Sequence, residues 1–311
     1  MRTIFFGTPA IAVPALRALA ETTELVGVVC QPDRPKGRGL ELGAPPVKLA
    51  AGELGVEVHQ PVKVKTGNLD EWIRARVPDV ALVIAYGRIL PPAVLAAPRF
   101  GCMNLHASLL PKLRGAAPIQ WALIGGETET GISLMQMDEG MDTGPVYSMR
   151  RIPIGAEETA GELATRLAEL AAVVVREDLP GAVVGGHHAA PQDDALATLA
   201  PPLRSGDARL DWTGASSDLV NRVRGFEPDP GAHTTLRGKR LRVHQLRISA
   251  YPASAAPGTV VLADKGGVVI ATGAGSVELV RAQLEGKRVV AARDLVNGRQ
   301  LAAGDVLGGA G

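Results

Sequence analysis

The chain has 311 residues, of which 46% are hydrophobic and 21% are charged, as in an ordinary globular protein large enough for two domains. Its 33 basic and 32 acidic side chains give a formal net charge of +1, which excludes a chain that is basic throughout, as many nucleic-acid-binding proteins are. No apolar run is long enough to span a bilayer and no targeting segment is visible, so we expect a cytoplasmic protein without membrane contact.

Apolar runs of strand type alternate with helical patterns from the N-terminus to about residue 175. We predict buried strands at residues 3–6, 25–30 and 80–85, and helices at residues 9–20, 46–53 and 69–76. This alternation is typical of a doubly wound α/β domain, in which ligands bind beyond the carboxyl ends of the strands. The first turn, Gly7-Thr8-Pro9, lacks the second and third glycines of a dinucleotide-binding fingerprint, so we predict no nucleotide site there.

Two polar side chains, Asn104 and His106, stand at the end of an apolar run. Residues i and i+2 of a strand share a face, so the amide and the imidazole are expected to project together. An amide can donate a hydrogen bond to a carbonyl oxygen, while an imidazole exchanges protons near neutral pH. For so short a pattern, a strand end with two satisfied polar side chains is the alternative.

A second apolar run, residues 131–137, ends in an acidic turn bounded by glycines. Glycines at these positions suit a backbone that closes tightly over a site. Asp142 in this turn is a candidate partner for a histidine. Read alone, the turn also fits a surface loop in which Asp138 and Glu139 are exposed acids.

Residues 162–177 predict an amphipathic helix whose packing face carries Leu163, Leu167, Leu170 and Val174. From residue 179 to residue 204 the sequence breaks into proline, glycine and small residues, which predicts a linker or an irregular crossing segment.

Neither the histidines nor the cysteines have the spacing of a metal site. His187 and His188 have no cysteine or carboxylate cluster nearby, and we interpret them as a solvated loop pair. Cys30 and Cys102 lie in apolar surroundings, which indicates buried free thiols in a reducing compartment.

The last third of the chain is its basic part. From Arg204 onward there are 15 Lys and Arg against 10 Asp and Glu, a net charge of +5, which leaves 18 against 22, or −4, for residues 1–203. A short helix at residues 216–224 precedes β-type runs separated by glycine turns, which predict a small antiparallel barrel. These runs are residues 240–248, 258–263, 267–271 and 277–280. The basic stretch 237–242 can contact phosphates, or it can be an ordinary solvated hairpin turn.

Taken together, the motifs resemble the folate-dependent formyltransferase family, and most closely its members that act on methionyl-tRNA. The likeness covers nearly the whole chain. It is carried by Ile4-Phe-Phe-Gly-Thr-Pro9, Gln31-Pro-Asp-Arg-Pro-Lys-Gly-Arg-Gly39, Ala85-Tyr-Gly-Arg-Ile-Leu90, Asn104-Leu-His106, Ser108-Leu-Leu-Pro111, Arg114-Gly-Ala-Ala-Pro-Ile-Gln120, Gly140-Met-Asp-Thr-Gly144, Arg209-Leu-Asp-Trp212 and Ala256-Pro-Gly-Thr259.

The resemblance implies a Rossmann-like α/β formyltransferase domain at residues 1–188, a linker at 189–204 and a smaller oligonucleotide-binding-type β-barrel at 205–311 that binds tRNA. It implies transfer of the formyl group of 10-formyltetrahydrofolate to the α-amino group of initiator methionyl-tRNA, for translation initiation. We expect a monomer that requires no metal.

Asn104, His106 and Asp142 match the catalytic residues of the family, residue for residue. Asn104 would donate to the oxyanion of the tetrahedral intermediate, and His106 would donate to it or exchange a proton. Asp142 would either favour the charged form of His106 and fix its orientation, or accept the amine proton directly or through water. The sequence leaves these two roles of Asp142 open.

The resemblance also implies two binding regions. The folate pocket would be lined by Ser108, Leu109, Leu110 and Pro111 and by the backbone of Arg88, Ile89 and Leu90. The loop at residues 31–39 would enter the acceptor stem of the tRNA. Charge for the tRNA would come from Arg34, Lys36 and Arg38 in this loop and from Lys239 and Arg240 in the barrel.

Two segments depart from the family pattern. Leu40-Glu41-Leu42 stands where relatives often have lysines, so RNA binding is expected to depend more on Arg38. Phe226-Glu227-Pro228-Asp229-Pro230 lacks an aromatic residue of the family pattern and adds acids, so we expect either barrel packing or RNA contact near this segment to differ from the family's.

Three other functions fit parts of the sequence. A nucleotide-sugar N-formyltransferase would share the Asn-His-Asp set without needing the basic loop or the basic barrel. A glycinamide-ribonucleotide formyltransferase would need only the first domain. A noncatalytic RNA-binding module predicts that the three polar side chains do not converge.

Overall fold

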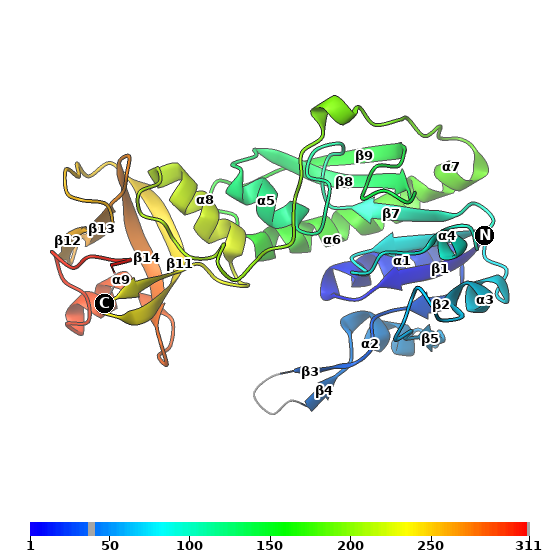
Figure 1. Cartoon of the computed structure of the whole chain (residues 1–311), viewed down its shortest axis with the longest axis horizontal. Coiled ribbons are helices and arrows are strands. Elements are labelled where there is room, and N and C mark those ends of the chain that lie inside the picture. Colours follow the sequence, from blue (N-terminus) through cyan, green and yellow to red (C-terminus); the bar gives the residue numbers. More distant parts are fainter. Residues whose placement is uncertain (37–40, 310–311) are drawn as a thin grey trace. The chain divides into compact units, whose positions relative to one another are not determined.

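The computed structural model describes residues 1–36 and 41–309 of the chain. It divides into two compact units (Figure 1). The first unit comprises Met1–Pro118, Glu129–Pro153 and Ala164–Pro201, and the second comprises Ile119–Thr128, Ile154–Leu163 and Pro202–Gly311. Within the described residues, no helix has the length and apolar composition needed to cross a membrane.

A seven-stranded sheet in the order β5-β2-β1-β6-β7-β8-β9 forms the first unit. The neighbouring strands β5, β2, β1, β6 and β7 pair in parallel. β8 pairs antiparallel with β7, and β9 pairs antiparallel with β8. The strands are β1 (Arg2–Gly7), β2 (Glu24–Val29), β5 (Val58–His59), β6 (Val80–Ile84), β7 (Cys102–His106), β8 (Glu129–Gln136) and β9 (Val146–Pro153). The strand order reverses between β1 and β6, and such a reversal creates a ligand-binding crevice at the carboxyl ends of the strands.

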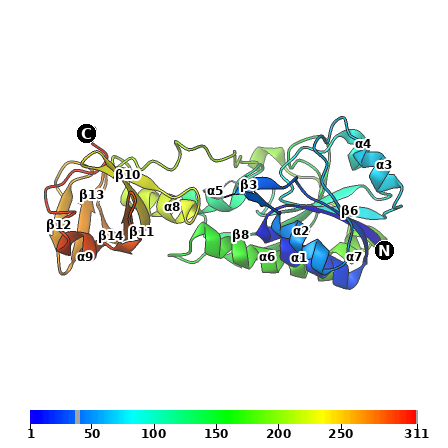
Figure 2. The ribbon, with the colours of Figure 1, turned by 90° about the horizontal axis from the view of Figure 1, so that it is seen from below.

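Helices cover both faces of this sheet, which confirms the doubly wound α/β prediction. In Figure 2, α3 and α4 lie on one side of the sheet and α1, α6 and α7 on the other. The helices in chain order are η1 (Ala10–Ala12), α1 (Val13–Thr22), α2 (Pro46–Glu53), α3 (Leu69–Arg74), α4 (Pro92–Leu95), α5 (Pro118–Ile124), α6 (Ala160–Glu177), α7 (Leu179–Val184) and η2 (Asp194–Leu196). A separate hairpin is formed by β3 (Arg34–Lys36) and β4 (Glu41–Gly43).

The start of α6 shows why the sequence folds as predicted there. Thr159 and Glu162 form a capping box: the Glu162 carboxylate accepts from the Thr159 backbone N–H at 2.9 Å, and the Thr159 hydroxyl accepts from the Glu162 N–H at 3.3 Å. Three residues of the predicted packing face, Leu163, Leu167 and Val174, are completely buried.

The helix α7 corrects one prediction, because its residues belong to the stretch 179–204 that was expected to be irregular. Pro180 lies in the first turn of α7, where a missing N–H costs no hydrogen bond, and Gly185 ends the helix with φ +85°. Proline and glycine here mark the two ends of a short helix.

The second unit contains the antiparallel β structure predicted for the last third of the chain. Its sheet has the order β10-β11-β14-β13-β12, with β15 paired to β14. Its elements are α8 (Ser216–Phe226), β10 (His233–Leu236), β11 (Lys239–Ser249), β12 (Val260–Asp264), β13 (Gly267–Ala271), β14 (Ser276–Leu284), β15 (Val290–Ala291) and α9 (Ala292–Asn297).

The two edges of this sheet are joined by the C-terminal residues 305–308. Leu307 bridges to Leu236 at the end of β10, and Val306 bridges to Thr259 beside β12. The backbone N–H of Val260 donates to the carbonyl of Asp305 at 2.8 Å. The segment thus covers backbone groups that would otherwise be exposed at both edges, as closure of a barrel does.

Candidate functional site

The site begins at the carboxyl end of β7. Asn104 and His106 alternate with the buried Met103 and Leu105, so the two polar side chains share one face of the strand. β7 lies between β6 and β8, and His106 is 5% exposed. A central strand with neighbours on both sides holds these side chains on a rigid element.

Asp142, in the loop between β8 and β9, completes a cluster with these two residues. Its Oδ2 atom lies 3.5 Å from Nδ1 of His106, and its Oδ1 atom accepts from Nδ2 of Asn104 at 3.4 Å. The backbone N–H of Gly115 donates to Oδ2 at 2.8 Å. Both contacts between side chains are longer than a normal hydrogen bond of roughly 2.9 Å, which leaves them room to shorten around a bound substrate.

The tautomer of His106 follows from its second nitrogen. Nε2 lies 2.9 Å from the backbone carbonyl oxygen of Leu113. A carbonyl oxygen only accepts hydrogen bonds, so Nε2 carries a hydrogen and donates it. In the neutral imidazole, Nδ1 therefore has the free lone pair, and it is this nitrogen that faces Asp142.

The loop at residues 113–115 makes hydrogen bonds to both His106 and Asp142. Leu113 (φ +60°) and Gly115 (φ +127°) have left-handed backbone conformations, as does Asp142 (φ +56°). A Cβ atom on Gly115 would lie 2.6 Å from the carbonyl oxygen of Ala200, so this position requires glycine for space as well as for φ. Sequence reasoning did not predict the contacts of Leu113 and Gly115, because they are made by backbone atoms.

Residues 108–111 form a turn after β7, in which Ser108 and Leu110 are buried. Ser108 is completely buried, and its hydroxyl donates to the carbonyl of Lys112 at 2.6 Å. The hydroxyl of Ser133 donates to the Ser108 carbonyl at 2.7 Å and accepts from the Leu110 N–H at 3.2 Å. Leu110 is 4% exposed, so Leu109 and Pro111, both half-buried, are the accessible residues of this turn.

The second predicted folate segment, residues 88–90, follows β6 at the point where the strand order reverses. The preceding carbonyl of Tyr86 accepts from the Thr8 hydroxyl at 3.2 Å and from the Gln31 side-chain amide at 2.9 Å. In contrast, the backbone N–H and C=O groups of Arg88, Ile89 and Leu90 make no hydrogen bond to any described residue. Ile89 is exposed and Arg88 is half-buried, so their backbone groups are accessible to a ligand, whereas Leu90 is 4% exposed.

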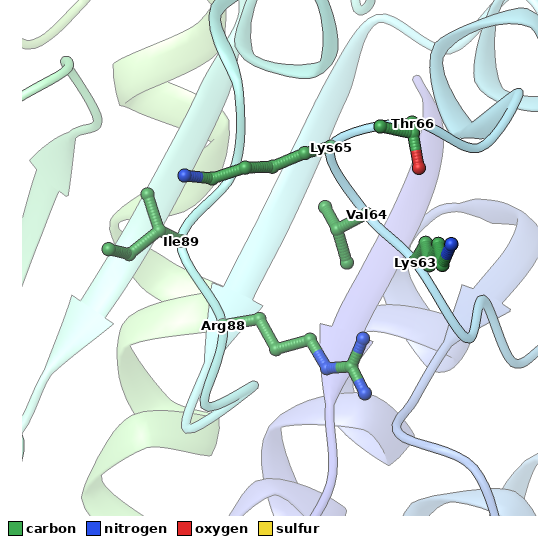
Figure 3. Close-up of a pocket in the computed structure, with 6 residues that line it drawn as sticks. All are labelled: Lys63, Val64, Lys65, Thr66, Arg88 and Ile89. Carbon is green, nitrogen blue, oxygen red and sulfur yellow. The ribbon is translucent and has the colours of Figure 1, made fainter.

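A cavity of about 560 Å³ lies beside this segment (Figure 3). Its lining residues are Lys63, Val64, Lys65, Thr66, Arg88 and Ile89. Arg88 donates to the carbonyl of Val62 at 2.7 Å, and in Figure 3 Lys65 extends toward Ile89. Of the described residues, three basic and no acidic side chains line the cavity, so it suits an anionic group. The turn at residues 108–111 does not contribute to this lining.

The predicted tRNA loop is only partly described. Arg34 lies in β3, and its guanidinium donates to the side-chain oxygen of Gln31 at 2.6 Å. Arg38 lies outside the described residues. Lys36 is the last residue of β3, and the structure describes its backbone but not its side chain.

The basic stretch of the barrel has fewer available charges than its sequence suggests. Arg237 is paired with Asp305 at 2.8 Å, and Arg242 is bonded to Glu227 and to the carbonyl of Pro228. Lys239 and Arg240 are exposed at the start of β11 and have no ion-pair partner among the described residues. They are therefore the cations of this stretch that can meet a phosphate without breaking an ion pair.

The acidic departure in the barrel, Glu227, is directed inward. Its carboxylate accepts from Nδ1 of His244 at 3.0 Å, and its side chain is 20% exposed. The adjacent Phe226 is completely buried in the core of the barrel. Packing of the barrel is thus retained despite the departure at this segment, and the additional exposed acid is Asp229.

Family models match both parts of the chain. The model described as formyl transferase matches residues 1–178, and the model described as formyl transferase, C-terminal domain, matches residues 202–300. Together they cover the sheet of the first unit, with Asn104, His106 and Asp142, and most of the barrel.

Curated relatives match over the full length. The methionyl-tRNA formyltransferase of Sorangium cellulosum (strain So ce56) is 60% identical over 310 residues, which cover 99% of this chain and 100% of the relative. That of Myxococcus xanthus (strain DK1622) is 49% identical over 97% of this chain and 96% of the relative.

Solved structures share the fold at lower identity. The N-formyltransferase from Helicobacter canadensis, solved in complex with folinic acid and dTDP-3-aminofucose, has a TM-score of 0.69 to this chain at 15% identity. The match covers 89% of this chain and 98% of that one. At this identity the match shows a common fold.

Proposed function

Because the chain belongs to the methionyl-tRNA formyltransferases of the formyl transferase family, we propose that it transfers the formyl group of 10-formyltetrahydrofolate to the α-amino group of initiator methionyl-tRNA. The observation that supports this most directly is the cluster of Asn104, His106 and Asp142 at the carboxyl end of β7. The product would serve translation initiation, and we propose a monomeric enzyme that acts in the cytoplasm.

The reaction makes two demands on the protein. The bound folate supplies a formyl carbon that the α-amine of the methionyl-tRNA attacks. As the new C–N bond forms, negative charge develops on the formyl oxygen, and the amine nitrogen must lose a proton. When the tetrahedral intermediate collapses, the bond between the formyl carbon and N10 of the folate breaks, and N10 takes up a proton as tetrahydrofolate leaves. An oxyanion donor and a proton acceptor are therefore required, and neither a covalent enzyme intermediate nor a redox step enters this route.

Asn104 suits the role of oxyanion donor. Its amide has two N–H hydrogens, and the long 3.4 Å contact to Asp142 engages at most one of them. His106 can add a second donor only through Nδ1 of the protonated imidazole, since Nε2 is bonded to Leu113. One such donor typically contributes about 3 kcal/mol to the stability of a transition state.

Proton removal falls to Asp142 or to Nδ1 of His106. Oδ2 of Asp142 is already bonded to the Gly115 N–H and faces His106, whereas Oδ1 has, within the described part of the chain, a single long hydrogen bond from Asn104. Oδ1 is thus the oxygen better placed to receive the amine proton, directly or through water. The His106 imidazole, close to the carboxylate, can share that proton through Nδ1.

The described residues fit a folate as formyl donor. The edge of a pterin ring alternates hydrogen-bond donors and acceptors. The backbone groups of residues 88–90, which have no hydrogen-bond partner among the described residues, complement such an edge. Lys63, Lys65 and Arg88 line the adjacent cavity, where positive charge suits the carboxylates at the other end of a folate. Folinic acid in the Helicobacter canadensis protein supports the same class of ligand.

The tRNA would be bound by two groups of cations. We assign them to the loop with Arg34, Lys36 and Arg38 and to Lys239 and Arg240 of the barrel. Lys239 and Arg240 are exposed and have no ion-pair partner in the part of the chain that the structure describes, so their charge can neutralise phosphates.

The experiment is an acceptor comparison with the purified chain. Each assay contains 10-formyltetrahydrofolate and one acceptor: methionyl initiator tRNA, methionyl elongator tRNA, or a dTDP-amino sugar. We expect tetrahydrofolate to form with the charged initiator tRNA and formylmethionine to be recovered from that tRNA. Turnover with the amino sugar alone would favour the nucleotide-sugar reaction and contradict this proposal.

A further inference from the structure

Residues 190–200, here called the strap, cross the loops that carry the catalytic cluster. The strap begins with a backbone pair between Ala190 and Val146, at 2.8 and 2.9 Å. Near its end, the Arg114 N–H donates to the carbonyl of Thr198 at 2.9 Å, and the Ala200 N–H donates to the carbonyl of Arg114 at 2.7 Å. The strap lies within the predicted linker 189–204, and it binds both the loop of Asp142 and the loop of residues 113–115.

Gln192 makes the central contacts of the strap. Its side-chain Nε2 donates to the backbone carbonyl of Asp142 at 2.8 Å and to that of Gly144 at 2.7 Å. Its Oε1 accepts from Nε and Nη2 of Arg114 at 3.0 and 2.8 Å. All hydrogen-bonding atoms of this amide are therefore engaged, and each acts in the direction that its chemistry allows.

Arg114 connects Gln192 to the loop at residues 113–115. It is 7% exposed, and its neighbours in the chain are the two residues that hold the catalytic pair: Leu113 accepts from His106, and Gly115 donates to Asp142. Its guanidinium also bonds to Asp194 at 2.7 Å. The amide of Gln192 thus connects the loop that supplies Asp142 to the loop that orients it and His106.

We propose that Gln192 is a positioning residue for formyl transfer, which sets the conformation of the Asp142 loop relative to His106. This inference rests on the proposed function. Asp142 has a left-handed backbone, which for a residue other than glycine persists only where its surroundings hold it. Gln192 bonds the carbonyl of that residue and that of Gly144, so it fixes the backbone on both sides of Thr143.

The test uses a substitution that separates the two functions of the amide. Gln192→Glu keeps an acceptor for Arg114 and replaces the N–H donors to the two loop carbonyls with a carboxylate oxygen that repels them. Asp194→Asn is the matched control, because Asp194 bonds Arg114 but does not contact the Asp142 loop. Both variants are compared with the wild type in kcat, in KM for each substrate and in thermal unfolding.

We expect Gln192→Glu to lower kcat about 10- to 100-fold, as loss of catalytic alignment does, with KM for tRNA and folate changed less than about 3-fold. Asp194→Asn should keep the wild-type kcat. A Gln192→Glu variant with wild-type kcat, or one that changes only KM, would overturn the proposal. So would an equal loss of kcat in Asp194→Asn.

A second measurement does not depend on turnover. The ¹⁵N chemical shifts of the His106 imidazole report which ring nitrogens carry hydrogen, and in the free protein they should change in Gln192→Glu and stay constant in Asp194→Asn. If Gln192→Glu does not fold, Gln192→Met replaces it, since methionine has similar length and no donor. Unchanged shifts in the folded variant would refute the positioning role. An inactive wild type with the expected shifts would instead refute the proposed reaction alone.

Discussion

Nε2 of His106 lies 2.9 Å from the carbonyl oxygen of Leu113, and this contact determines how the imidazole can act. The carbonyl keeps a hydrogen on Nε2, so proton exchange and donation to substrate are both restricted to Nδ1. Since Nδ1 is the atom that faces Asp142, the histidine and the carboxylate act on the same side of the ring.

Replacement of Asn104 by alanine should lower kcat by about 10²- to 10³-fold, since one oxyanion donor is removed. Asn104 is half-buried, and among the described residues its side chain makes a single long hydrogen bond, to Asp142, so the fold should be retained. Steady-state kinetics with charged initiator tRNA, together with circular dichroism, measure both effects. A folded variant with wild-type kcat would show that Asn104 does not donate in the transition state.

Neighbouring cations of the barrel should differ in how much they contribute to tRNA binding. Lys239→Ala with Arg240→Ala should weaken tRNA binding and reduce the slope of log K against log salt by about 0.9 for each phosphate that the protein no longer neutralises. Arg237→Ala is the matched control, because the Arg237 charge is already paired with Asp305. Binding titrations between 50 and 200 mM salt, chosen to span roughly the range where phosphate binding weakens most, measure the slopes. Equal effects in both variants would contradict this assignment.

Gly115→Ala should lower both stability and activity. A φ of +127° is strained for any residue with a side chain. The added methyl group would also lie only 2.6 Å from the carbonyl oxygen of Ala200. Where the backbone suits alanine, this substitution stabilises a protein by up to about 1 kcal/mol, whereas at an incompatible position it destabilises by more than that, so the free energy of unfolding should fall by more than about 1 kcal/mol. Urea denaturation measures it, and Gly206→Ala, where the methyl group would meet nothing within 4 Å, is the control. A Gly115→Ala midpoint equal to that of the control would show that the loop readily accepts a methyl group.

The buried thiols predict loss of stability at alkaline pH. Burial raises the pKa of Cys30 from 9.0 to about 11 and that of Cys102 to about 12. Above pH 9 the unfolded chain releases thiol protons that the native state retains, so stability falls as pH rises from 9 toward 11. The test compares the denaturation midpoints of the wild type and Cys30→Ala at pH 7 and at increasing pH above 9. The midpoint should fall less steeply with pH in the variant. Parallel declines would contradict this origin.

The α/β domain was predictable from local patterns, as β1, β2, β6 and α2 show, because buried strands and amphipathic helices have distinct periods. The two-residue spacing of Asn104 and His106 was enough to place them on one face of a strand. The contacts of Leu113 and Gln192 had no such signal, since one uses a backbone carbonyl and the other lies in a segment rich in small residues.

The sequence also predicted only in part which cations of the barrel are available to RNA. Within the stretch 237–242, Arg237 and Arg242 are engaged by acids from distant positions, Asp305 and Glu227. Pairing across such separations depends on the folded sheet. Composition alone therefore overstated the charge that this stretch offers to RNA.

The most direct test of the central claim is single-turnover formyl transfer by the variant Asn104→Ala/His106→Ala/Asp142→Ala. The enzyme is held in excess over charged initiator tRNA, and formylmethionyl product is followed by mass spectrometry. We predict a rate at least about 10³-fold below that of the wild type, and a combined loss smaller than the product of the three single losses, because the three side chains act as one unit. A folded triple variant with near wild-type rate would contradict the account.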